Sequence, residues 1–151
     1  MEEIEMNAEI EEMLTRICED EEKELTELFV MPEDNEKYVC EAEKILGMQF
    51  PTEYRQYLLE YGEGGMGCFY FFGVSPETDV DKQTIVSMTL EYREKGMPNN
   101  LAVLYHSGDY LHCIDCANGK VVNWSWLDGG AIYVDSNSFD EYFKMILEDY
   151  I

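Results

Sequence analysis

The glycine-rich stretch Tyr61 to Gly67 reads YGEGGMG and contains the G-x-G-x-x-G spacing of a dinucleotide-binding turn. In such a turn a strand precedes the glycines and a helix begins at the last one, so that the pyrophosphate lies at the helix N-terminus. Here the flanking patterns predict a helix before the glycines and a strand after them, and Glu63 would repel a phosphate. We therefore interpret the stretch as a glycine turn that binds no nucleotide, and we expect no cofactor.

Cys113 and Cys116 are the cysteine pair whose spacing is typical of a metal site. A zinc site needs further ligands, and the remaining cysteines, Cys18, Cys40 and Cys68, lie far apart in the sequence. Residues i and i+3 of an extended strand also face opposite sides and cannot bind one ion together. We predict reduced, metal-free thiols, because five scattered cysteines fit a reducing compartment better than a disulfide framework.

Candidate catalytic groups are few. His112 and Cys113 are neighbours on a predicted strand and point to opposite faces, so they cannot act together as base and nucleophile. His106 and Ser107 lie in a predicted turn, where a solvated pair is the ordinary interpretation. Residues 79–81 begin like a calcium loop but lack its glycine and its bidentate glutamate. The sequence therefore predicts no metal, no catalytic residue and no enzyme.

Helical patterns dominate the first sixty residues. Apolar residues recur at helical spacing over residues 10–17 and again over residues 25–29, which predicts one or two amphipathic helices. A third stripe, over residues 34–46, ends at Gly47, and a fourth begins at Pro51 and ends at Gly62. The glycines of the opening motif therefore follow a helix.

Strand patterns dominate the second half. Residues 68–74 form an aromatic strand, and a helix is predicted from about Asp81 to Lys95. Short strands follow over residues 101–105, 110–116, 120–126 and 131–134, joined by turn signals that favour an antiparallel meander. Ser138 begins a capping box that leads into a last helix. The order of elements predicts an α+β fold with helices packed on one mainly antiparallel sheet.

The charge restricts the partners. The chain has 151 residues, 33 of them acidic and 10 basic, and a net charge of −23. Such a field repels nucleic acid and anionic membranes, and it would attract a basic protein, although it also serves solubility alone. About half of the acidic residues lie within residues 1–43. Because no signal peptide and no run of about 18 apolar residues is found, we expect a cytoplasmic protein.

Several motifs together resemble the SMI1/KNR4 (SUKH) superfamily. The run from Ala42 to Gly65 resembles its opening, with a helix ending in Leu-Gly, a Phe-Pro-x-x-Tyr motif and a helix closing on Gly-Gly. Later pieces fit in order over about residues 35–150: a Gly-Asp…Asp strand over residues 108–115, Val-x-x-Trp over residues 121–124 and Ser-Phe-x-x-Tyr in the last helix. In this family the recurring positions are mainly scaffold; here they are Pro51, Tyr54, Gly64, Gly65, Asp115, Trp124 and Phe139.

The length of the chain predicts a single domain over residues 1–151, and the resemblance implies an α+β fold for it. The acidic helical segment at about residues 1–30 is less typical of the family, and nothing is carried over to it. Members are largely bacterial immunity proteins that neutralise polymorphic toxins, often nucleases, and others are interaction adaptors. The resemblance thus implies a non-catalytic antitoxin with a cognate toxin as partner, which we expect to be basic. An intracellular adaptor with a non-toxin partner is the alternative.

Acidic side chains predicted in loops and one tryptophan are the candidate partner-binding residues. An inhibitor of a basic nuclease would place acids where the enzyme binds phosphates, and Trp124 and Trp126, on one sheet face, are either core residues or an aromatic anchor. We favour the core interpretation and retain Trp126 as a candidate. The candidate set comprises Glu63, Asp109, Trp126, Asp128 and Asp135.

Overall fold

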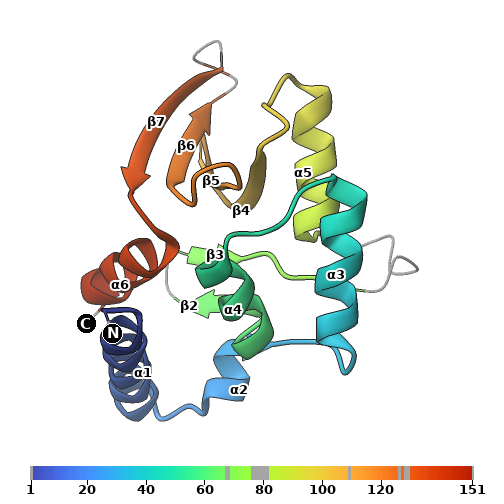
Figure 1. Cartoon of the computed structure of the whole chain (residues 1–151). Coiled ribbons are helices and arrows are strands. Elements are labelled where there is room, and N and C mark those ends of the chain that lie inside the picture. The colour runs from blue at the N-terminus through green and yellow to red at the C-terminus, as the bar shows by residue number, and fades with distance from the viewer. Residues whose placement is uncertain are drawn as a thin grey trace.

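The computed structural model describes residues 2–66, 69–75, 82–108, 110–125, 127 and 130–150. Helices and strands are mixed along the chain, as expected for an α+β protein (Figure 1). The described helices are α1 (Glu2–Glu21), α2 (Leu25–Leu28), α3 (Asn35–Leu46), α4 (Thr52–Glu60), α5 (Ile85–Glu94) and α6 (Phe139–Tyr150). The strands are β1 (Phe29–Val30), β2 (Glu63–Met66), β3 (Phe69–Phe71), β4 (Leu101–Ser107), β5 (Tyr110–Asp115), β6 (Val121–Ser125) and β7 (Ala131–Ser136).

The strands form two antiparallel sheets. One has three strands in the order β1-β2-β3, and the other has four in the order β4-β5-β6-β7. The predicted meander of β4 to β6 is confirmed and continues into β7. The two sheets adjoin where the backbone N–H of Phe72, just after β3, donates to the carbonyl of Leu104, at 2.9 Å. The antiparallel α+β prediction is confirmed, and the expected single sheet is divided in two.

The glycine turn predicted at Tyr61 to Gly67 is wrong, because strand β2 occupies Glu63–Met66. β2 pairs with β1 on one side and β3 on the other, and Gly64 adopts a φ of 145°. A Cβ at Gly64 would collide with the carbonyl oxygen of Leu28, and one at Gly65 with that of Phe69. The glycines therefore allow the neighbouring strands to approach closely.

Three of the predicted helix-boundary signals mark helix ends in the structure. Gly47 ends α3 with a left-handed φ of 72°, and Pro51 immediately precedes α4. The Ser138 hydroxyl accepts a hydrogen bond from the Glu141 N–H at 3.2 Å, as a capping box requires. The predicted start of α5 at Asp81 is wrong, because the helix begins at Ile85 after a Thr84 cap. Asp81 itself lies outside the described residues.

The four-stranded sheet lies between two helices. On one face the Trp124 ring lies 6.2 Å from the Tyr92 ring of α5. On the other face the Tyr142 hydroxyl of α6 lies 2.9 Å from His112 Nδ1. Trp124 is only 1% exposed, so the core interpretation of this tryptophan is confirmed. His112 and Cys113 point to opposite faces, also as predicted.

An aromatic cluster joins α4, β3 and α6. The Tyr57 ring lies 5.0 Å from the Phe139 ring, 5.3 Å from the Phe143 ring and 5.6 Å from the Phe71 ring. Each of these side chains is at most 3% exposed. Edge-to-face contacts of this kind add to the stabilisation from buried area.

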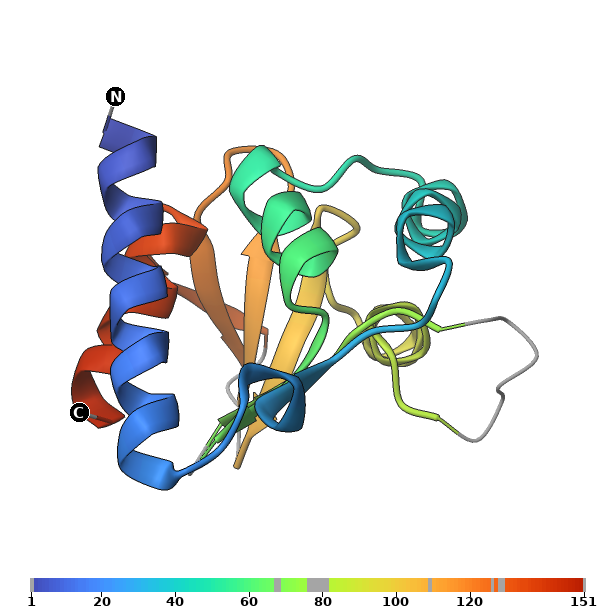
Figure 2. The same ribbon diagram turned by 90° about the horizontal axis from the view of Figure 1, so that it is seen from below.

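Helix α1 packs along α6, as Figure 2 shows from below. The predicted amphipathic pattern is confirmed, because Ile10, Leu14 and Ile17 are each at most 3% exposed and belong to the common core. An ion pair of 2.5 Å between Lys144 and Glu9 links the two helices at the surface. None of the described helices combines the length and apolar character that crossing a membrane requires.

Candidate functional site

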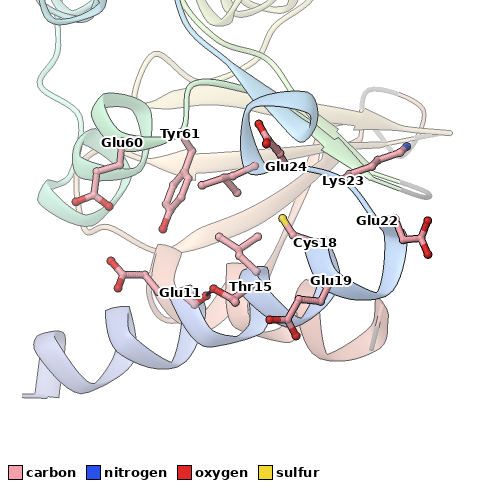
Figure 3. A pocket seen from close by; sticks show the side chains of 11 residues that line it. Glu11, Thr15, Cys18, Glu19, Glu22, Lys23, Glu24, Glu60 and Tyr61 are labelled. Atoms are coloured by element: carbon pink, nitrogen blue, oxygen red, sulfur yellow. Dashed lines mark hydrogen bonds between the residues drawn. The ribbon is translucent and has the colours of Figure 1, made fainter.

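An acidic groove lies between α1, α2 and the end of α4. Its shape depends on the chain reversal after α1, where Glu22 adopts a left-handed φ of 54°. The N–H of Lys23 donates to the carbonyl of Cys18 at 2.9 Å and closes the helix. The chain then turns into α2, which stands as a second wall opposite the outer face of α1 (Figure 3).

The groove has an apolar floor and an acidic rim. Its volume is about 790 Å³, within the range of about 300–1,000 Å³ that is typical of ligand-binding pockets. The floor is formed by Leu14, Cys18, Leu25 and Tyr61, and the rim by Glu11, Glu19, Glu22, Lys23, Glu24 and Glu60. In Figure 3 the Tyr61 ring extends from the end of α4 toward α1. We call this surface the acidic groove.

The rim carboxylates determine the electrostatics of the groove. Among the residues whose side chains the structure describes, none of the five rim glutamates forms an ion pair, and all five are exposed. Their charge also acts on the groove floor, since burial and then the nearby Glu60 and Glu11 carboxylates raise the pKa of Tyr61 to about 12. The groove therefore presents a negative field together with a phenol that remains protonated.

A larger hollow of about 880 Å³ lies between α3 and α4. Two of its charges compensate each other, because Arg55 forms an ion pair with Glu43 at 3.2 Å; Arg55 also donates to Cys40 Sγ at 3.2 Å. The Glu43 carboxylate also accepts the backbone N–H of Phe50 at 2.8 Å. These contacts fix the local backbone, and we regard the acidic groove as the stronger candidate.

Glu63 was a predicted partner-binding acid, and the structure places it in strand β2 with only 7% exposure. Its carboxylate forms an ion pair with Lys82 and accepts a hydrogen bond from the Tyr70 hydroxyl at 2.8 Å. Its expected position in an exposed turn is therefore wrong, because the carboxylate is held inside the protein by these two groups.

Asp135 was also predicted in a loop, but it lies within strand β7 and is half-buried. Its carboxylate lies 3.7 Å from His112 Nδ1, and burial raises the pKa of this carboxyl. The remaining candidates, Asp109, Trp126 and Asp128, lie outside the described residues.

Cys113 and Cys116 are poorly suited to nucleophilic chemistry and to metal binding. Burial raises the pKa of the Cys113 thiol strongly and that of Cys116 to about 12, so both remain protonated and are poor nucleophiles and metal ligands. Cys113 contacts Met97 Sδ at 3.9 Å. His106 and Ser107 lie within strand β4 and not in the predicted turn. Within the described part of the chain, no cluster of three potential metal ligands is found.

The acidic groove was not among the sequence predictions. Its signal was the concentration of acids in the first 43 residues, of which Glu11, Glu19, Glu22 and Glu24 form four of the five rim carboxylates. The fifth, Glu60, belongs to α4 and is distant in sequence. Only the packing of α1 against the core brings these residues together.

The fold and the groove can be compared with known protein families. Residues 6–148 match the model of the SUKH_5 family, described as SMI1-KNR4 cell-wall. The chain belongs to this family. The matched SMI1-KNR4 region includes most of α1, so residues 6–30 of the acidic segment, which is less typical in sequence, lie within it. No individually curated protein shows significant similarity to the chain.

Proposed function

We propose that this SMI1-KNR4 protein is a non-catalytic immunity protein that binds and neutralises a cognate toxin domain. The observation that carries the proposal is the family match over residues 6–148, nearly the whole chain. Immunity against toxins is common in this family. The buried Cys113 thiol, whose pKa is raised by burial so that it stays protonated, is consistent with a protein that acts by binding.

The net charge of −23 favours a basic partner. Nucleases that bind a phosphate backbone carry basic surfaces, and an acidic inhibitor would compete with nucleic acid for that surface. Neutralisation would then be steric and electrostatic. Long-range attraction would mainly accelerate association.

A test of the function searches the genes beside this one for an encoded toxin domain. That domain is inactivated by substitution for the binding assay and left active for the protection assay. We expect the immunity protein to restore growth of cells that express the active domain and to bind the inactivated one. Association should slow with added salt, because the Debye length falls from about 10 Å at 0.1 M to about 3 Å at 1 M. Dissociation should change less.

Absence of binding and of protection would overturn the proposal and favour an adaptor with a non-toxin partner. Binding whose association rate does not respond to salt would retain the immunity function and reject the electrostatic mechanism.

A further inference from the structure

A smaller apolar hollow continues the acidic groove toward β1. Its volume is about 270 Å³, and it shares Leu25, Glu60 and Tyr61 with the acidic groove. Large apolar side chains are unusually open here, with Leu25 37%, Val30 53% and Met31 48% exposed. The two hollows therefore form one elongated depression with an acidic half along α1 and an apolar half along β1.

The two halves differ in chemistry: one exposes negative charge and the other exposes apolar surface. The lining of the acidic half contains five exposed glutamates and one basic residue, Lys23, so its charge is strongly negative. In the apolar half, the open side chains keep apolar surface in water, which favours contact with another apolar surface by about 25 cal/mol for each Å² buried. A ligand that satisfies both halves must itself be amphipathic.

We propose that this depression binds one amphipathic segment of the partner protein, with its basic side chains against α1 and its apolar side chains against β1. The inference rests on the proposed function, because the segment is assigned to the cognate toxin. It adds the binding face, the chemistry of the segment and its orientation.

The alternatives fit the depression less well. A nucleic acid or another anionic ligand would be repelled by the rim carboxylates. A second copy of this chain would bring a second net charge of −23 to the same surface. A short segment with lysine or arginine beside large apolar residues complements both halves at once, and such charge matching fixes register.

The first experiment compares two triple variants with the same net charge. The groove variant carries Glu11→Lys, Glu19→Lys and Glu60→Lys, all on the acidic rim. The control carries Glu12→Lys, Asp20→Lys and Glu36→Lys, which are exposed and outside the groove lining. Binding kinetics are measured against the inactivated neighbouring toxin domain, after circular dichroism has shown that both variants fold.

We expect the groove variant to bind at least about 100-fold more weakly than the wild type, because like charges would meet at the interface. The control should lose no more than about fivefold, mostly in association rate, because it changes only the long-range field. Equal losses in the two variants would overturn the inference and leave the immunity function standing. A wild type that neither binds nor protects would instead overturn the function.

The second experiment tests the apolar half in the same way. Leu25→Ser with Val30→Ser removes two open apolar side chains of the depression, while Leu90→Ser with Met145→Ser removes two of similar exposure elsewhere. We expect the first pair to raise the dissociation rate about tenfold or more and the second to leave it unchanged. An unchanged dissociation rate for the first pair would reject the proposed orientation.

Discussion

His112 is enclosed by aromatic rings on the face of the sheet that α6 covers. Its ring stacks on Tyr105 at 4.3 Å, and its Nδ1 lies 2.9 Å from the Tyr142 hydroxyl. Burial lowers its pKa from 6.5 to about 4, and this effect outweighs the attraction of Asp135 at 3.7 Å. The folded protein therefore keeps this histidine neutral under conditions in which the unfolded chain would protonate it.

His112 should make the stability of the protein depend on pH. Because the folded pKa is lowered to about 4, the contribution is complete above pH 6.5 and is lost as the pH falls from 6.5 to 4. We expect the free energy of unfolding, measured with urea, to fall between about pH 7 and pH 5 by about 1–2 kcal/mol more in the wild type than in His112→Asn. Asn keeps a polar atom near the Tyr142 hydroxyl.

Asp135→Asn is the control for this titration. If His112 is the titrating group, the control should retain the pH dependence of the wild type. The raised pKa of Asp135 makes its own contribution to stability fall as the pH rises, which is the opposite sign to that of His112. A control that loses the dependence, or identical profiles for the wild type and His112→Asn, would contradict the prediction.

The buried Glu63 carboxylate depends on Lys82 for its charge balance and on the Tyr70 hydroxyl for a hydrogen bond. Lys82→Met should cost about 2 kcal/mol or more, because it leaves a carboxylate with 7% exposure without its cation. Glu63→Gln should lower the free energy of unfolding by about 1 kcal/mol less than Lys82→Met does. The amide keeps an acceptor for the Tyr70 hydroxyl, and the partly exposed Lys82 can turn to water. Equal unfolding free energies in urea titrations of the two variants would disprove this asymmetry.

At the scale of elements, the glycines of β2 have a role that differs from that of a helix-ending glycine. A Cβ at Gly65 would collide with the backbone carbonyl of Phe69, whereas Gly47 has a φ of 72° and open space around it. Gly65→Ala should therefore cost about 3 kcal/mol or more, because backbone must move. Gly47→Ala should cost only about 1 kcal/mol, for its left-handed conformation. Thermal unfolding of the two variants measures both losses of stability. Losses of similar size would refute the close approach of the strands.

The same glycines explain where the sequence misleads. Helix α3 and strands β4 to β7 are predictable because their apolar residues recur at regular spacing between turn signals. Strand β2 contains two glycines and shows no such pattern; its position is set by the neighbours β1 and β3. The start of α5 is likewise set by Thr84. Its N–H donates to the Ser87 hydroxyl, and its own side chain accepts the Ser87 N–H. In the sequence this capping signal is weaker than the acidic residues further upstream, which predict an earlier start.

The acidic groove was unpredictable for a related reason. The amphipathic pattern of α1 identifies which face is buried, through Ile10, Leu14 and Ile17. It does not identify what the exposed face will stand beside. That depends on the contact with α6 and on the turn at Glu22, which together bring α1 opposite Tyr61.

At the scale of the whole molecule, the net charge of −23 acts against the compact state, because like charges are closer together after folding. Salt should relieve this repulsion as the Debye length falls from about 30 Å at 0.01 M to about 8 Å at 0.15 M. We expect the melting temperature to rise by about 2–4 °C over this range of sodium chloride, as measured by circular dichroism.

The control for this prediction is the triple variant Glu12→Lys, Asp20→Lys and Glu36→Lys. Its three charge reversals change the net charge from −23 to −17, so its melting temperature should respond less to salt. A melting temperature that is unchanged or falls with salt would contradict the prediction.

The packing of α1 against α6 also sets an order of events during synthesis. Helix α1 leaves the ribosome before α6, which covers its apolar stripe and is made more than a hundred residues later, at Phe139–Tyr150. Until then Ile10, Leu14 and Ile17 have no α6 to pack against, and in proteins most of the stability of a helix comes from the packing of its amphipathic face. The contact between the two helices is thus among the most non-local in the chain, and we expect it to close late in folding. The acids on the outer face of α1 would meanwhile keep this waiting segment soluble.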